Sequence, residues 1–176
     1  MSENNFPDCE RCEYDTCIEM LEQRGYNVID KDVIIIAIKP NGEQMAVIFN
    51  NSEKFDTKGI KEVIHIMTEI EVEHVIIVYK NDVTSATKCI ISNSGKKQIE
   101  LFSRDDLKYN ITKHCLQPQF ERLSDQESVK FKQQYGTTFG TLRVDKPISR
   151  FYDYKRGDVI RITRKDGYIN YRIVKG

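Results

Sequence analysis

Residues 155–174 have the sequence KRGDVIRITRKDGYINYRIV. In each half of this stretch apolar residues alternate with polar ones, which is the two-residue period of a half-buried β-strand. Asp166-Gly167 lies between the halves, and both residue types tolerate the positive φ of a tight, two-residue primed turn. The stretch therefore predicts a β-hairpin that carries a row of arginines. A two-stranded hairpin is not stable alone in water, so other elements must pack against it.

The residues before this hairpin supply such elements. Ser124-Asp125-Gln126-Glu127 is a capping box that predicts the start of a helix, which should run to Tyr135 and stop at Gly136. Residues 137–144 are expected to be extended. Pro147 is expected to open a short helix that leads through Tyr152 into the hairpin. Together these features predict a small C-terminal α+β domain.

The N-terminal part has the alternating pattern of an α/β domain. Apolar residues recur at helical spacing in two segments and form short continuous runs in others. We expect, in order, a helix at 8–24, strands at 33–38 and 44–49 joined at Asn41-Gly42, a helix capped by Asp56 or Thr57, a strand at 74–79, a short helix at 85–91, a strand at 98–102 and one helical turn opened by Ser103. The segment 109–119, which contains Pro118, is the expected boundary, giving domains 1–112 and 113–176.

The order of residues in the C-terminal region carries a resemblance. Pro147, Arg150-Phe151-Tyr152, the strand at 159–163 and Tyr171-Arg172-Ile173 occur in an order similar to that of the C-terminal assembly domain of the fifth subunit shared by eukaryotic nuclear RNA polymerases, a domain with a counterpart among the small subunits of the archaeal enzyme. Residues 19–26 resemble the first helix of that family's N-terminal jaw domain. Nearly the full chain is covered, from about residue 16 to residue 174.

The chain departs from the family pattern in places. The family's Thr-Pro-Ser-Ala turn appears as Thr84-Ser85-Ala86, without the proline, and Asp153 replaces a usual glycine. The hairpin loop is trimmed, and the jaw is shorter between Gly25 and Lys61. Such shortening suits a divergent lineage, for example a large DNA virus that carries its own polymerase.

The resemblance implies a non-catalytic subunit of a multisubunit DNA-dependent RNA polymerase. Its partners would be the largest subunit, on which the C-terminal domain docks, the other subunits, and downstream double-stranded DNA, which the N-terminal domain approaches weakly as part of the lower jaw. Such a subunit would lie in the nucleus of a cell, or in the virion or infected-cell cytoplasm of a virus. The implied fold is α+β: an α/β jaw domain with an inactive restriction-endonuclease-like layout, followed by a small α+β assembly domain.

Two sets of side chains are candidates for these contacts. Basic and aromatic residues near the hairpin are typical of protein interfaces, and those expected to bind the partner are Arg150, Tyr152, Lys155, Arg156, Gly157, Arg161, Arg164, Tyr171 and Arg172. Gly157 is included for its backbone, which should turn the chain into the strand. The residues expected near DNA phosphates are Lys80, Asn81, Thr84, Ser85 and Lys88.

The charge distribution is consistent with two modules that meet different partners. Residues 113–176 hold 14 basic and 7 acidic residues, a net charge of +7, while residues 1–112 hold 13 and 20, a net charge of −7. No apolar stretch is long enough to span a bilayer and no signal peptide is visible, so we expect an intracellular protein without a membrane partner. The five cysteines are therefore expected to be reduced thiols.

Catalytic and metal sites are not expected. Cys9 and Cys12 have zinc-ligand spacing, with Cys17 nearby, but the next cysteines are Cys89 and Cys115, far along the chain. We therefore expect neither metal nor cofactor. The histidines His65, His74 and His114 occur singly; we expect the first two to be structural and the last to pack in the hinge.

Two alternative functions remain open. A restriction-type nuclease would need an acidic residue and then an acid-x-Lys motif, and Asp32 and Glu43 are suitably placed. However, Met45 occupies the position of the lysine, so such a nuclease would be degenerate. A free-standing nucleic-acid-binding protein is the other alternative, and it would show salt-sensitive binding to DNA in isolation.

Overall fold

The chain forms two compact units, Met1–Tyr109 and Asn110–Gly176. The computed structural model describes residues 8–31, 34–95 and 97–176. The second unit begins just before the 3-10 helix η1(Ile111–Lys113), and the predicted boundary between residues 112 and 113 falls within this helix. Each unit has its own sheet, and the fold is α+β.

The N-terminal unit is built around a five-stranded sheet with the order β1-β2-β3-β5-β7. Strands β3, β5 and β7 are parallel, and β1 and β2 are antiparallel to their neighbours. A small parallel pair, β4-β6, lies beside it. The elements are α1(Asp8–Gln23), β1(Asn27–Lys31), β2(Ile34–Ile38), β3(Gln44–Asn50), β4(Lys54–Phe55), α2(Thr57–Glu69), β5(His74–Tyr79), β6(Asp82–Val83), α3(Ser85–Ser92), β7(Gln98–Ser103) and α4(Arg104–Leu107).

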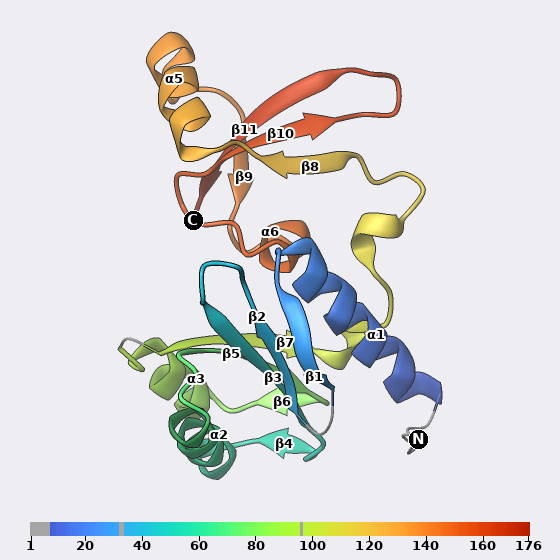
Figure 1. Ribbon diagram of the computed structural model, residues 1–176, viewed down its shortest axis with the longest axis vertical. Helices are drawn as coiled ribbons and strands as arrows, with labels where there is room; N and C mark the ends of the chain where they lie inside the picture. The colour runs from blue at the N-terminus through green and yellow to red at the C-terminus, as the bar shows by residue number, and fades with distance from the viewer. Residues whose placement is uncertain (1–7, 32–33, 96) are drawn as a thin grey trace. The chain divides into compact units, whose positions relative to one another are not determined.

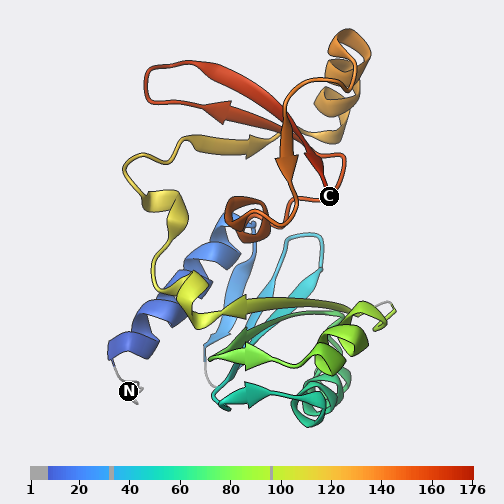
Figure 2. The ribbon, with the colours of Figure 1, turned by 180° about the vertical axis from the view of Figure 1, so that it is seen from behind.

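Helices cover both faces of this sheet (Figures 1 and 2). On one face, Ile60 and Met67 of α2 pack in a core with Ala46 and Ile77 of the strands. On the other face lies α1, whose Tyr14 ring stacks on Phe49 with centroids 5.9 Å apart. Because β5 is covered on both faces, its first five residues are all buried, which explains the continuous apolar run in its sequence.

The C-terminal unit contains a four-stranded sheet with the order β8-β10-β11-β9. Strand β10 pairs antiparallel with both β8 and β11, and β9 pairs parallel with β11. Its elements after η1 are β8(Gln119–Arg122), α5(Asp125–Tyr135), β9(Thr141–Arg143), α6(Pro147–Phe151), β10(Val159–Thr163) and β11(Ile169–Lys175). The predicted capping box is confirmed, with the Ser124 and Glu127 side chains each accepting from the other's backbone N–H.

The two faces of the C-terminal sheet pack differently. Ile160 and Ile162 face a core that includes Ile148 of α6. On the other face, the Phe131 ring of α5 lies 4.5 Å from the Tyr171 ring of β11, measured between centroids. The sheet therefore gains a helix on each face, as the instability of an isolated hairpin requires.

The turns at Asp166-Gly167 and Asn41-Gly42 differ from the two-residue primed turn predicted at Asp166-Gly167. Gly167 N donates to Arg164 O at 3.0 Å and Arg164 N donates to Tyr168 O at 2.9 Å, which closes a three-residue loop. Only Gly167 of the loop has positive φ, +83°. Asp166 instead accepts from Tyr168 N through its Oδ1 at 3.0 Å. The loop at Asn41-Gly42 has the same hydrogen bonds, so Asp and Asn act here as side-chain acceptors, followed by a left-handed glycine.

The longer loop divides the predicted row of arginines. With a two-residue turn at 166–167, Arg161 would lie opposite Arg172. In the structure Arg161 lies opposite Tyr171, and Arg172 lies opposite Ile160. Because neighbouring residues of a strand point to opposite faces, Arg161 and Arg172 are on different faces of the sheet.

Several weak strands were not predicted, and one expected extended segment is shorter than proposed. The unpredicted strands are β1, β4, β6 and β8. Of residues 137–144, only Thr141–Arg143 form a strand. His114, expected to pack in the hinge, is exposed, and its Nδ1 accepts from Leu116 N at 3.2 Å. It therefore stabilises a local turn.

Asp153 has a left-handed backbone, with φ of +54°, at the position where the family usually has glycine. A β-carbon is unfavourable in this conformation. We expect the Asp153→Gly variant to be more stable than Asp153→Ala by about 1 kcal/mol, because both lose the ion pair with Lys155 and only alanine keeps the strain.

Urea unfolding followed by far-UV circular dichroism would measure this difference. Asp145 offers a matched control, since it also pairs with a basic residue, Arg143, and has no positive φ. Glycine should not be the more stable substitution there. Equal stability of the two Asp153 variants would contradict the assigned backbone strain.

Candidate functional site

The predicted docking residues next to α6 form a compact group. The Tyr152 ring stacks on that of Tyr154 with centroids 5.3 Å apart, and burial raises the pKa of both hydroxyls. Lys155 Nζ donates to Asp153 Oδ1 at 2.7 Å. Arg150 lies on α6 itself and is half-buried. This group presents aromatic surface and a cation from one helix and the turn that follows it.

A second group lies on the α5 side of the sheet. Arg161 is flanked across the strands by Glu121 of β8 and Tyr171 of β11, and its guanidinium donates to Glu121. This hydrogen bond raises the pKa of Arg161. Lys132 of α5 donates to the Gly157 carbonyl at 2.6 Å, which ties the helix to the start of β10. The expected backbone role of Gly157 agrees with its φ of +94°.

The remaining docking candidates are dispersed. Arg164 lies over the Tyr168 ring at the hairpin tip, with its guanidinium carbon 5.4 Å from the centroid. Arg172 donates to Thr141 O at 3.1 Å on the opposite face from Arg161. Arg156 donates to the Gly176 carbonyl. The structure thus brings together some of the predicted set and separates Arg172 from Arg161 and Tyr171.

The candidates for DNA contact are contiguous at the carboxyl end of β5. Lys80 and Asn81 follow this strand directly, Thr84 caps α3, and Ser85 and Lys88 lie in the first helical turns. Helix α2 begins at the same end, where the Asp56 carboxylate accepts from two backbone N–H groups. The lysines and the N-terminus of α3 would attract phosphate, whereas at α2 the Asp56 carboxylate already occupies the backbone N–H groups.

An acidic residue that the sequence analysis did not identify reduces the positive charge at this end of the sheet. Glu53 accepts from Lys80 Nζ at 2.7 Å and from Asn81 Nδ2 at 2.6 Å, and these bonds lower the pKa of Glu53. Glu53 is 27 residues before Lys80, so no local spacing pointed to the pair. Its charge reduces the net positive field of the surface and makes strong binding of DNA by this unit alone unexpected.

The opposite end of the N-terminal sheet contains a chain of charged groups that was also missed. Arg24 donates through both terminal nitrogens to Glu100, at 3.0 and 2.9 Å. Glu100 Oε1 lies 2.5 Å from His74 Nε2. On the other side of the imidazole, His74 Nδ1 lies 4.0 Å from Glu43 Oε1, which accepts from Tyr26 OH at 2.6 Å. Burial alone would raise the pKa of Glu100, but His74 and Arg24 lower it to about 2.

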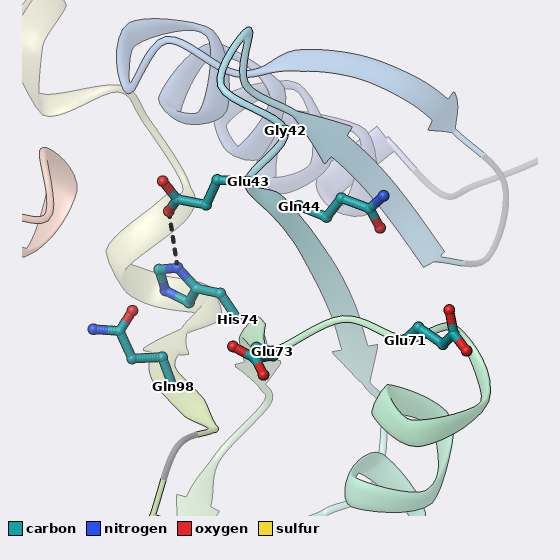
Figure 3. A pocket seen from close by; sticks show the side chains of 7 residues that line it. All are labelled: Gly42, Glu43, Gln44, Glu71, Glu73, His74 and Gln98. Carbon is teal, nitrogen blue, oxygen red and sulfur yellow. Dashed lines mark ion pairs between the residues drawn. The ribbon is translucent and has the colours of Figure 1, made fainter.

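These groups border a cavity of about 450 Å³, which we call the acidic pocket (Figure 3). Its lining includes three carboxylates, two amides and one imidazole: Glu43, Glu71, Glu73, Gln44, Gln98 and His74. Figure 3 shows the side chains of Glu43 and His74 pointing toward one another at the starts of β3 and β5. His74 is thus a buried imidazole that lies between two carboxylates.

Only some of the residues considered for metal or nuclease chemistry are described. Asp32 and the side chain of Cys9 lie outside the described residues. Cys12 is exposed and Cys17 is buried on α1, and burial raises the pKa of the Cys17 thiol. Met45, at the position where a nuclease would need lysine, is fully buried.

Comparison with known proteins gives the family. The family of RNA polymerase Rpb5 C-terminal domains matches residues 109–174. A putative DNA-directed RNA polymerase subunit of Invertebrate iridescent virus 6 is 32% identical over 92% of this chain and 97% of its own length. The chain belongs to the RNA polymerase Rpb5 family. The resemblance found in the sequence is thereby confirmed.

Cellular relatives of this Rpb5-family chain are more distant. Subunit RPABC1 of DNA-directed RNA polymerases I, II and III from Caenorhabditis elegans is 28% identical over 82% of this chain and 72% of its own length. Subunit 5A of DNA-directed RNA polymerase V from Arabidopsis thaliana is 26% identical, covering 89% and 84%. Both matches extend well beyond the C-terminal unit, so the N-terminal unit is also similar in sequence to these subunits.

The hydrogen-bonded side chains of Arg24, Glu100 and His74 predict a specific pH dependence of the free energy of unfolding. The pKa of Glu100 is lowered from 4.5 to about 2 on folding, so its contribution is complete above pH 4.5 and is lost as the pH falls toward 2. This amounts to about 3 kcal/mol. Glu100→Gln should remove that decline from the unfolding free energy and destabilise the protein at pH 7, since Arg24 would lose its charged partner.

Unfolding by urea at pH values from 2 to 7, followed by circular dichroism, would check this prediction. Glu69→Gln is a suitable control, because Glu69 is exposed on the same unit. That variant should keep the wild-type curve. An equally steep decline in the Glu100→Gln protein would contradict the assignment.

Proposed function

We propose that this chain is a non-catalytic subunit of a multisubunit DNA-directed RNA polymerase and that its C-terminal unit docks on the largest subunit. The observation that carries the proposal is the correspondence of two boundaries. The matched Rpb5 domain covers residues 109–174, and the compact C-terminal unit covers Asn110–Gly176. This unit also has a net charge of +7 and half-buried tyrosine and arginine side chains, which suit an interface with an acidic protein surface.

The N-terminal unit is proposed to form part of the lower jaw, near incoming downstream DNA. Its support is local: Lys80, Ser85 and Lys88 share one end of the sheet with the N-terminus of α3. The whole unit has a net charge of −7, so DNA contact depends on the polymerase holding the duplex there. The other polymerase subunits are further expected partners.

The place of action follows from the origin of the polymerase. Cellular relatives belong to eukaryotic polymerases, so a cellular chain would act in the nucleus. The similarity to an iridescent virus subunit favours a viral chain, which would act in the virion or the infected-cell cytoplasm. Among the helices of the described residues, none has the length and apolar character to span a bilayer.

Docking can be tested with a double substitution on the α5 side of the sheet and the hairpin tip. Arg161→Ala combined with Arg164→Ala should weaken binding to the largest subunit by about 10- to 100-fold, since arginines are enriched among residues that dominate interface energy. Quantitative pull-down of the largest subunit by the tagged full-length chain would measure this. Arg143→Ala, also in the C-terminal unit, should bind normally; equal binding by all three proteins would refute this docking surface.

The jaw assignment can be tested in assembled polymerase. Lys80→Ala combined with Lys88→Ala should lower affinity for downstream duplex DNA and reduce the dependence of log K on log salt by about one unit per lost phosphate contact. Filter binding across a salt series would show both effects. Lys113→Ala is the control of equal charge type outside the jaw, and an unchanged slope in the double variant would exclude these lysines as DNA contacts.

A further inference from the structure

The acidic pocket has a negative charge that the described residues of its unit balance only in part. Glu43, Glu71 and Glu73 line it, and none of the described lysines or arginines does. Lys39 binds the Oε2 atom of Glu43 at 2.9 Å. Glu71 and Glu73 have no ion pair among the residues that the structure describes. The pocket therefore has a negative potential that would attract a cation.

His74 supplies an independent indication of a ligand. Its side chain is 5% exposed, and its Nδ1 atom has no hydrogen-bond partner within the described part of the chain. The other ring nitrogen faces Glu100, which the low pKa keeps ionised, so Nε2 must carry a proton and donate it. The buried Nδ1 atom points toward Glu43 across the pocket, and it is an acceptor whenever the imidazole carries its single proton on Nε2.

The distance across the pocket defines what kind of donor fits. His74 Nδ1 and Glu43 Oε1 are 4.0 Å apart, too far for a direct hydrogen bond. A group with two N–H bonds could donate one to each atom at ordinary distances of about 2.8–3.0 Å. Ammonium and guanidinium groups offer several such donors and carry the charge that the carboxylates require.

A bound metal ion agrees less well with the same geometry. A zinc site needs at least three protein ligands. Within the N-terminal unit, the described residues place no three potential ligand atoms within 4.8 Å of one another. His74 and Glu43 supply only two, so the site lacks the coordination that zinc demands.

We propose that the acidic pocket binds the guanidinium or ammonium group of a basic side chain presented by a neighbouring polymerase subunit, with Glu43 and His74 as direct acceptors and Glu73 as an added negative charge. The source of the side chain rests on the proposed function. The binding chemistry does not, because it follows from the charge and geometry of this unit alone.

The chemistry can be tested on the full-length chain with Nα-acetyl-arginine N-methylamide and the corresponding lysine derivative. Nuclear magnetic resonance should show saturable shifts of the Gln44, His74 and Gln98 amides, with millimolar affinity for at least one probe. Glu43→Gln and Glu73→Gln should each weaken binding at least 5-fold. Glu69→Gln removes an equal charge outside the pocket and should bind as the wild type does.

Three results would overturn the pocket assignment. They are shifts no larger than those from sodium chloride at equal ionic strength, equal binding by the Glu43 and Glu73 variants and the wild type, or saturable binding of zinc chloride at His74 without binding of either probe. A folded state confirmed by the amide spectrum excludes misfolding as the cause.

The source of the side chain needs the assembled polymerase. Glu73→Lys should repel the cation and lower retention of the chain at raised salt at least 5-fold, whereas Glu69→Lys should not. If the wild-type chain assembles but binds neither probe, the pocket proposal fails alone. If it binds a probe but never co-purifies with polymerase, the proposed function and the subunit source fail together. If Glu73→Lys is retained normally, the subunit source fails.

Discussion

The interior position of β5 in the five-stranded sheet constrains the rest of the N-terminal unit. This strand pairs with β3 and β7 and has helices against both faces, so its interior must be apolar and its backbone fully paired. The requirement ends at its first residue, His74, which is polar but still buried. A buried imidazole needs partners. Glu100 from β7 and, through it, Arg24, which directly follows α1, meet this need. The strand order thus joins three distant parts of the sequence by hydrogen bonds.

Much of this fold could be predicted because its signals are local. The Asp56 cap and the helical spacing of apolar residues predict α2, and a capping box predicts α5. A continuous apolar run predicts β5. The strands that escaped prediction lack such signals. Strand β1 has the sequence NVIDK and β8 has QFER, and each is a strand because a neighbour pairs with it. Short edge strands of this kind depend on tertiary contact, which outweighs intrinsic propensity.

The surroundings of the candidate surfaces were harder to predict, for the same physical reason. Lys80 and Asn81 follow a recognisable strand, whereas their counter-ion Glu53 is held near them only by the fold. The prediction of a single row of arginines was wrong because the loop is one residue longer than expected. Because side chains alternate with a period of two, one extra loop residue placed Tyr171 opposite Arg161 and moved Arg172 to the other face. Register is a property of the turn, and Asp-Gly is compatible with both turns.

The helices of the N-terminal unit connect its two proposed sites. A helix in a parallel crossover runs opposite to its strands, so α2 and α3 begin at the basic end of the sheet, and α2 ends near the acidic pocket. Neither helix has an acidic residue in its first turn or a basic residue in its last, the placements that would complement its dipole. Lys58, in the first turn of α2, and Glu69, in its last, have the opposite arrangement. Each such charge lowers the stability of the helix by about 0.3–1 kcal/mol. At the C-terminal end of α2 the dipole adds to the charge of Glu69, so this end attracts a cation, whereas at the N-terminal end the Asp56 carboxylate offsets the charge of Lys58 and of the dipole.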